Sequence, residues 1–202
     1  APRWTPDGSA LFYSADRDGN EQPGYFTISA DGLEEREILP AARGDFRSFG
    51  AFGDDGSFLY ASTARTGEVF DIYRGTLDGQ TQLLVESELG LVPRSLSPDG
   101  RHALVTETVG EDADNLYLLD LSTREMQDVA RPPVEQRASH TLGGFAWKPD
   151  SSGFYFSSNE GREFAALSYY DMATGRISMV AESDHDVGSI ELCGSDADLL
   201  LW

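Results

Sequence analysis

The stretch W-T-P-D-G-S-A-L-F-Y-S, residues 4–14, decides the fold, because the chain repeats it. Three further copies are F-G-D-D-G-S-F-L-Y-A-S at 52–62, L-S-P-D-G-R-H-A-L-V-T at 96–106 and W-K-P-D-S-S-G-F-Y-F-S at 147–157, and a degenerate copy, L-C-G-S-D-A-D-L-L-L-W, occupies 192–202. The aspartate of the motif falls at Asp7, Asp55, Asp99, Asp150 and about Asp196, in steps of 48, 44, 51 and about 46 residues. A period of roughly 40–50 residues indicates an array of supersecondary units.

Each repeat is predicted to form four short strands. The P-D-G segment is a tight turn, because proline fixes φ, aspartate bonds its own backbone and glycine accepts a positive φ. The strand after this turn is expected at about 10–15, 57–63, 101–107, 153–158 and 197–202. The third strand, in which apolar and polar residues alternate, is expected to begin at Tyr25, Asp71, Asn115 and Ser168. A shorter fourth strand is expected at about 35–39, 80–85, 125–129 and 176–181. A small-residue strand then precedes the next motif, as in G-G-F-A-W from Gly143.

These units predict an all-β chain with almost no helix. No window of 11–18 residues keeps an apolar 3.6-residue period without an interrupting glycine or proline. Four-stranded antiparallel units of this length in tandem are typical of β-propeller blades of the TolB or WD40 type. A long-period solenoid is the alternative, and the hairpin turns between strands disfavour it. The G-H and W-D pairs of true WD40 repeats are absent.

The phase of the repeat predicts about four blades in one partial propeller domain, residues 1–202, with repeats starting near 4, 52, 96, 147 and 192. The chain opens at the end of an inner strand, Arg3–Trp4, and stops inside a second strand. We therefore expect an arc of a seven- or eight-bladed propeller. The alternative is a closed four-bladed ring in which 188–193 supplies the missing inner strand. An open arc exposes strand edges, which predicts self-association.

Composition disfavours several classes of partner. Lysine and arginine total 15 and aspartate and glutamate 35, so the net charge is −20 and the pI is about 4.3. Such a surface repels phosphates, so we expect no nucleic acid and no anionic membrane as partner. The sequence has no run of 18 apolar residues of the kind that predicts a membrane-spanning helix. Cys193 is the single cysteine, which excludes an intrachain disulfide and favours a reducing, cytoplasmic location.

No catalytic, metal or cofactor site emerges from the motifs. No serine lies in the G-x-S-x-G elbow of an α/β-hydrolase. The three histidines, His102, His140 and His185, and Cys193 lack the short paired spacing of zinc sites. The D-R-D-G-N-E segment from Asp16 does not match an EF-hand loop and is better explained by turn chemistry.

Repeated aromatic residues are predicted to be structural. Trp4 and Trp147 share one repeat position, and Tyr13 and Tyr155 are assigned to another, which predicts packing between blades. Residues that depart from the repeat are better site candidates. These are Arg131, Arg137 and His140 in the loop 130–141, and Arg162 in the loop 160–164. Such arginines could face a central channel and contact a peptide carboxylate or a partner domain; the alternative is that they are solvated.

The ordered series of repeats resembles a known family. It comprises F-D-I-Y-R-G-T-L-D-G, S-P-D-G-R-H-A-L-V, N-L-Y-L-L-D-L-S-T and W-K-P-D-S-S-G-F-Y-F-S-S-N-E-G-R-E-F-A-A-L-S-Y-Y-D-M-A-T-G. Together they are similar to the propeller of prolyl oligopeptidase family serine peptidases, nearest the bacterial acylaminoacyl-peptidase-like and dipeptidyl-peptidase-like branch. The resemblance covers essentially all 202 residues, although TolB-type propellers share single P-D-G motifs.

The resemblance implies a role without catalysis for this segment. In that family a seven- or eight-bladed propeller precedes an α/β-hydrolase domain that carries serine, aspartate and histidine, and it admits only short or unstructured peptides. No position here matches the elbow or its partners, so no catalytic residue is transferred. The expected partners are a hydrolase domain of the same parent chain and short peptide substrates. The alternatives are a TolB-like module that binds a protein or peptide, and a propeller enzyme with its site in the channel.

Overall fold

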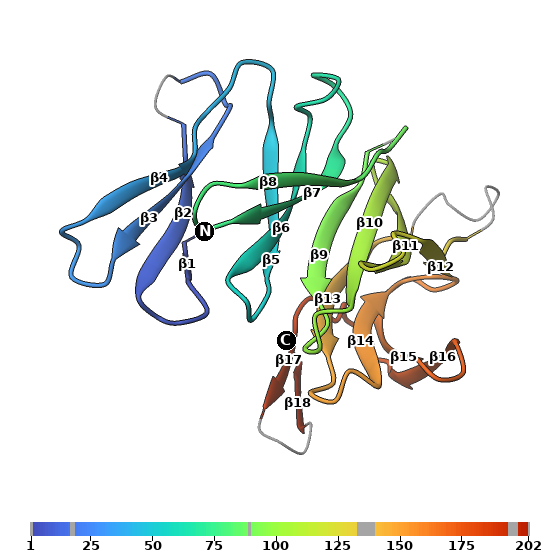
Figure 1. Cartoon of the computed structure of the whole chain (residues 1–202). Coiled ribbons are helices and arrows are strands. Elements are labelled where there is room, and N and C mark those ends of the chain that lie inside the picture. Colours follow the sequence, from blue (N-terminus) through green and yellow to red (C-terminus); the bar gives the residue numbers. More distant parts are fainter. Residues whose placement is uncertain (1, 17–18, 89, 133–139, 194–197, 202) are drawn as a thin grey trace. The chain divides into compact units, whose positions relative to one another are not determined.

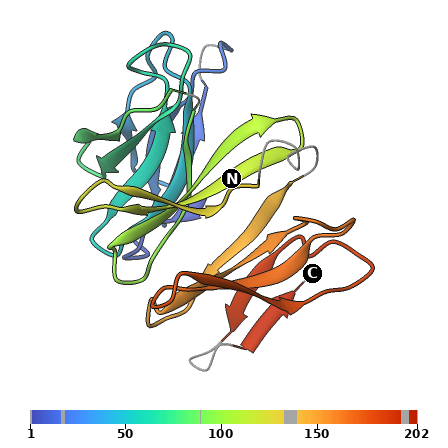
Figure 2. The same ribbon diagram turned by 90° about the vertical axis from the view of Figure 1, so that its right-hand side faces the viewer.

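A computed structural model describes residues 2–16, 19–88, 90–132, 140–193 and 198–201 (Figures 1 and 2). The described residues form strands β1 to β18 and contain no helix. Four of the sheets are four-stranded and antiparallel, with short turns between consecutive strands. This confirms the predicted all-β chain of four blades. Contacts divide the chain into two compact units, Ala1–Pro93 and Arg94–Trp202, which are described separately.

Unit 1 contains two blades, with the strand orders β1-β2-β3-β4 and β5-β6-β7-β8. The bounds in the first blade are Arg3–Trp4 (β1), Ala10–Ala15 (β2), Gly24–Ser29 (β3) and Glu35–Leu39 (β4). Those in the second are Arg47–Phe52 (β5), Ser57–Ser62 (β6), Asp71–Thr76 (β7) and Thr81–Val85 (β8). The predicted second and fourth strands agree with these bounds to within one residue. The two-residue β1 matches the predicted remnant of an inner strand.

Unit 2 holds the next two blades and a hairpin, and the boundary between units falls inside β9. The third blade comprises Val92–Leu96 (β9), His102–Gly110 (β10), Ala113–Asp120 (β11) and Met126–Ala130 (β12). The fourth comprises Leu142–Trp147 (β13), Gly153–Ser158 (β14), Ala166–Asp171 (β15) and Arg176–Ala181 (β16). The hairpin pairs Ile190–Cys193 (β17) with Asp198–Leu201 (β18). The closed-ring alternative used 188–193 as an inner strand of the first blade, whereas β17 pairs with β18.

The P-D-G turns form as their sequence requires. In all four motif copies the aspartate accepts a hydrogen bond from the amide two residues later, over 3.0–3.1 Å. The next position has a positive φ: 68° at Gly8, 78° at Gly56 and 68° at Gly100. In the fourth copy Ser151 takes the same conformation, at 58°, without the freedom of glycine. The turn geometry therefore persists even where its preferred residue is lost.

The turn aspartates should make the fold acid-sensitive. A serine or threonine hydroxyl beside each carboxylate is the main cause that lowers the pKa of Asp7, Asp31, Asp55, Asp78, Asp99, Asp120, Asp150 and Asp171. For Asp120, beside Ser122, the pKa falls to about 2. A lowered folded pKa contributes stability that is present above the unfolded value near 3.9 and is lost as the pH falls through the folded pKa. The temperature at the midpoint of thermal unfolding should therefore decrease as the pH falls from 4 to about 2.

The variant Asp120→Asn tests this directly. It should lower stability at neutral pH and flatten the pH dependence below pH 4, because the carboxylate that loses its hydrogen bonds on protonation is gone. The variant Glu34→Gln, at another exposed acidic position, serves as control. Equal pH profiles for Asp120→Asn and the unmodified chain would contradict the role of this turn.

Every blade carries a β-bulge at the same place. Where the third and fourth strands pair, one residue of the outer strand is skipped. The skipped residues are Ile38, Leu84, Val129 and Val180. A bulge bends its strand and interrupts the hydrogen-bonding edge that another strand could join. In two blades the skipped residue contributes to the core. Ile38 is buried in the core of unit 1, and Val129 packs against the core of unit 2.

Each unit has an apolar core shared by its two blades. In unit 1, Phe12 of β2 lies 5.2 Å from Phe58 of β6 and 5.1 Å from Tyr25, measured between ring centroids. In unit 2, Leu104 of β10 shares a cluster with Phe154 of β14. Phe154 stacks on Tyr170, with 5.0 Å between ring centroids and 21° between planes. The interface between two blades is thus the hydrophobic core, as a propeller requires.

The structure corrects two predictions about the aromatic repeat. Trp147 is buried, but Trp4 at the equivalent position is 55% exposed. Tyr13 lies two residues beyond the partner of Trp4, whereas Tyr155 lies one residue beyond the partner of Trp147. Because side chains alternate along a strand, these tyrosines occupy opposite faces of their blades. Each packs on the residue directly opposite in its own sheet, Tyr13 on Phe26 and Tyr155 on Tyr169.

Candidate functional site

The candidate residues belong to one end of the sheets, which we call the loop end. Here the second strand of each blade ends, the third begins, and the chain enters the next blade. The P-D-G turns form the opposite end. Arg131, His140 and Arg162 all follow or precede strands at the loop end of unit 2. Arg137 lies outside the described residues.

The two described arginines pair with carboxylates of their own blades. Arg131 Nη1 lies 3.6 Å from Asp128 Oδ2 on β12. Arg162 Nη1 lies 3.1 Å from Glu182 Oε2, directly after β16, and 2.9 Å from the sulfur of Met179. Both β12 and β16 are the outermost strands of their sheets. These contacts place Arg131 and Arg162 toward the outer strands. The predicted contact with a peptide or partner domain stays a prediction.

His140 is the best-defined candidate, because it ties the third blade to the fourth. Its backbone pairs with the third blade: the His140 amide donates to Asp112 O over 2.8 Å, and the Asp114 amide donates to His140 O over 2.9 Å. The ring, 1% exposed, has Nδ1 2.8 Å from Asp114 O and Nε2 3.1 Å from Ser158 Oγ. Ser158 is the last residue of β14, so the imidazole bridges two blades of unit 2.

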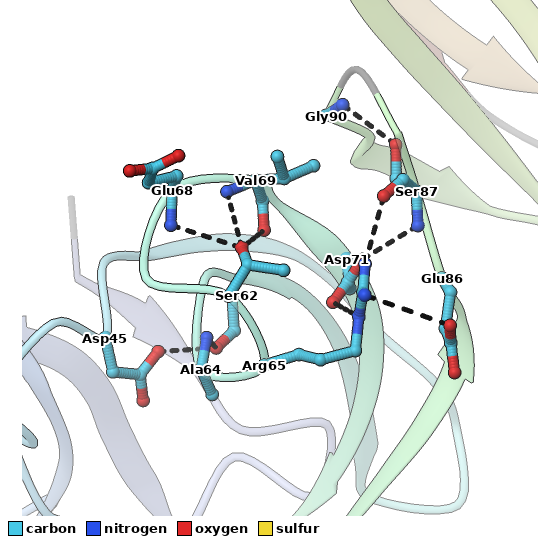
Figure 3. Close-up of polar contacts among 11 residues, drawn as sticks. Asp45, Ser62, Ala64, Arg65, Glu68, Val69, Asp71, Glu86, Ser87 and Gly90 are labelled. Carbon is cyan, nitrogen blue, oxygen red and sulfur yellow. Dashed lines mark hydrogen bonds and ion pairs between the residues drawn. The ribbon is translucent and has the colours of Figure 1, made fainter.

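Unit 1 contains the same joint with another acceptor. Asp45 lies two residues before β5, as His140 lies two before β13, and Ser62 ends β6, as Ser158 ends β14. The Ser62 hydroxyl donates to Asp45 Oδ1, and Ser62 Oγ accepts the Ala64 amide at 3.0 Å (Figure 3). In unit 2, Ser158 Oγ likewise accepts the Glu160 amide, at 3.1 Å.

The residues beside each joint match as well. The Phe46 amide donates to Thr63 Oγ1 over 2.9 Å, and the Thr141 amide donates to Asn159 Oδ1 over 2.8 Å. Sequence reasoning missed this pairing, although a signal existed. Asp45 and His140 each stand two residues before a first strand, and a serine with a polar neighbour ends the second strand.

A second polar cluster holds the loop end of the second blade (Figure 3). The Arg65 guanidinium donates to both carboxylate oxygens of the fully buried Asp71, over 2.7 and 2.9 Å, and to Ser87 O over 3.0 Å. The Ser87 amide donates to Asp71 Oδ1 over 2.8 Å. A planar guanidinium suits such a two-pronged contact. Arg65 and Asp71 thus fasten the loop between β6 and β7 to the chain after β8.

The Ser158–His140 contact pairs the residue types of a catalytic nucleophile and its base, but its surroundings are not those of a catalytic pair. A catalytic serine must be reachable by substrate and must leave a site for the oxyanion. Ser158 is only 7% exposed, His140 only 1%, and Ser158 Oγ already accepts an amide hydrogen. The arrangement supports a structural joint.

Two cavities lie away from this joint, at the turn end. One, of about 410 Å³ in unit 1, is lined by the turn residues Pro6, Asp7, Asp54, Asp55, Leu77 and Asp78 among others. The other, of about 270 Å³ in unit 2, includes His102, whose Nε2 lies 3.9 Å from Asp120 Oδ2. Across the ranges that the structure describes, no group of three or more histidine, cysteine, aspartate or glutamate residues could hold a metal ion. The same residues include no helix long and apolar enough to cross a membrane.

Comparison with solved structures identifies the fold. TolB from Acinetobacter baumannii matches with a TM-score of 0.66 and 17% identity, over 95% of this chain and 45% of that one. The putative TolB from Agrobacterium tumefaciens gives 0.74 and 15%, over 100% and 68%. One of two prolyl endopeptidases studied for inter-domain dynamics in catalysis and specificity gives 0.75 and 16%, over 100% and 31%.

This chain therefore spans less than half the length of the first and third of these proteins. No family model and no curated protein sequence matches it. At 15–17% identity the likeness concerns the fold. The four four-stranded antiparallel sheets and these neighbours agree, and the chain is a partial β-propeller.

Proposed function

We propose that this chain is the non-catalytic propeller segment of a serine peptidase of the prolyl oligopeptidase family. In this role it would restrict peptide access to an α/β-hydrolase domain that lies outside residues 1–202, and pack against that domain. The observation that carries the proposal is the match of the whole chain to a prolyl endopeptidase at a TM-score of 0.75, together with the ordered repeat series. The buried state of Ser158 and His140 supports a segment without catalysis.

Within this proposal the loop arginines are interface contacts. Arg131 and Arg162 extend toward outer-strand carboxylates, and their side chains are 48% and 33% exposed. An exposed guanidinium that is already paired on one side can still donate hydrogen bonds to a carboxylate of a packed domain. We propose the same general role for Arg137, whereas His140, at 1% exposed, holds the loop in place.

The experiment uses the whole parent protein and a fluorophosphonate probe, which labels activated serines. We expect one labelled serine, located outside residues 1–202, and hydrolysis of short peptides but not of the same sequences held in a folded protein. The chain of 202 residues alone should show neither label nor hydrolysis. A parent with the labelled serine changed to alanine is the control. Absence of label in the parent, or label on Ser158, would refute the proposal.

A TolB-like binding module is the second candidate function. It is favoured by the match to the putative TolB, which covers 68% of that chain, more than for the peptidase. Such a module would bind a protein or peptide without cleaving it. Three results on the parent protein would support this candidate against the first. Calorimetry would show stoichiometric peptide binding, the bound peptides would be recovered intact, and the fluorophosphonate probe would find no reactive serine.

A further inference from the structure

We propose that His140 and Ser158 form a proton-sensitive clasp between the third and fourth blades, which is closed when the imidazole is neutral and weakened when it is protonated. The inference rests on the joint described above and is independent of the proposed function. It concerns three described segments: 112–114 on the third blade, 140–141 before β13, and 158–160 on the fourth blade.

Hydrogen-bond geometry assigns the closed form. Asp114 O can only accept, so Nδ1 must carry a hydrogen. In the neutral ring Nε2 is then an acceptor, and the Ser158 hydroxyl donates to it. Both lone pairs of Ser158 Oγ remain available, and one accepts the Glu160 amide. Every polar group of the joint is satisfied in this state.

Protonation reverses one of these bonds. Imidazolium carries hydrogens on both nitrogens, so Nε2 becomes a donor toward Ser158 Oγ. Ser158 Oγ can accept from both Nε2 and the Glu160 amide, but its own hydrogen would lose its acceptor. The ring would also carry a charge at a site that is 1% exposed. A buried hydroxyl hydrogen without an acceptor and a buried charge both cost free energy, so the closed clasp is weakened.

The equivalent joint in unit 1 uses a carboxylate where the clasp uses an imidazole. Ser62 Oγ accepts the Ala64 amide, as Ser158 Oγ accepts the Glu160 amide, and the Ser62 hydroxyl donates to a carboxylate oxygen of Asp45. Arg47 Nε donates to the other oxygen of Asp45 over 2.7 Å, so the charge has a partner. A neutral imidazole and its protonated form differ in their hydrogen-bond donors, so of the two joints the one with imidazole is suited to respond to protons.

The segments beside His140 carry mainly acidic residues. These are Glu111, Asp112 and Asp114 on the third blade and Glu160 and Glu163 on the fourth, together with Arg162, which pairs with Glu182. Asp114 Oδ1 accepts the Thr108 hydroxyl at 2.7 Å, and the side chains of Glu111, Asp112 and Glu160 are exposed. These acidic side chains come from both of the blades that the clasp joins.

Residue-resolved amide hydrogen exchange of the 202-residue chain at pH 7.5 and 5.5, corrected for intrinsic rates, tests the clasp. We expect the amides of Asp114, Thr141 and Glu160 to exchange about tenfold faster at pH 5.5, the effect of losing roughly one net hydrogen bond. The amides of Phe46 and Ala64 should keep their protection. Equal changes at both joints, or no change at Glu160 and Thr141, would overturn the proposal.

Two variants test the role of the imidazole. His140→Asn supplies an amide donor toward Asp114 O and an amide oxygen toward the Ser158 hydroxyl without a titratable group, and it should abolish the pH response in unit 2. His185→Gln changes a histidine that is 84% exposed and should leave the response intact. A response that survives His140→Asn would overturn the proposal. Nitrogen-15 NMR of the unmodified chain gives a second test, which does not require any variant to fold. It should find the Nδ1–H tautomer of His140 at pH 7.5, and the Nε2–H tautomer would exclude the clasp.

Discussion

Replacing Phe154 with alanine should lower the free energy of unfolding by about 3–5 kcal/mol, the range for large aromatic residues in a packed core. Phe154 is 0% exposed and lies 4.9 Å from Trp147 and 5.0 Å from Tyr170, measured between ring centroids. Its cluster includes residues from both blades of unit 2, so the cavity would open at their shared interface. Urea denaturation followed by tryptophan fluorescence and by circular dichroism measures the loss.

Tyr155→Ala is the matched control for this prediction. Tyr155 follows Phe154 in the same strand, is half-buried, and points to the opposite face of the blade. Its loss should cost clearly less, because part of the ring already contacts solvent. Equal destabilisation by the two variants would contradict a shared core on the Phe154 face of the sheet.

Gly75→Ala should destabilise unit 1 by about 1–3 kcal/mol, as expected when a methyl group is forced into a packed site. Gly75 of β7 lies directly opposite Phe58 of β6. A Cβ at this position would stand 2.4 Å from Phe58 Cζ and 2.6 Å from its Cε2. Because Phe58 is 1% exposed, its ring has little room to move away. The measurement is again the free energy of unfolding in urea.

A double-mutant cycle with Phe58→Leu isolates this clash. Leucine removes the ring atoms that a Cβ at position 75 would meet, so Gly75→Ala should cost less in the Phe58→Leu background than in the unmodified chain. Residues in direct contact commonly show coupling of about 0.5–3 kcal/mol. Strict additivity of the two substitutions would contradict the packing of Phe58 over Gly75.

The repeat period and the turn chemistry made the blades predictable from sequence. Local rules decide these features: proline, aspartate and glycine specify a turn, and aromatic and β-branched residues specify the strands beside it. The face of each aromatic side chain was harder to predict. Counting from Trp4 and Trp147, Tyr13 is nine residues on and Tyr155 eight, and a difference of one residue reverses the face of a strand.

The joints at the loop end were not predictable from local rules. His140 and Ser158 are 18 residues apart, and Asp45 and Ser62 are 17 apart, because each pair is separated by the first strand, the turn and the second strand of a blade. The sequence marked His140 as a residue that departs from the repeat, and the structure shows that it occupies the place of Asp45. Its partner became visible only when the ends of β13 and β14 were brought together in space.

The bulges in β4 and β12 make two neighbouring blades depend on each other. Ile38 belongs to the fourth strand of its blade, yet it lies in one cluster with Phe58 and Tyr60 of the following blade, and Val129 contacts the core that contains Phe154. The bulge residue of the fourth blade, Val180, is instead 47% exposed. Deleting Ile38 or Val129 would remove the bulge and its apolar side chain together, so the packing of the following blade would be lost along with the shape of the strand.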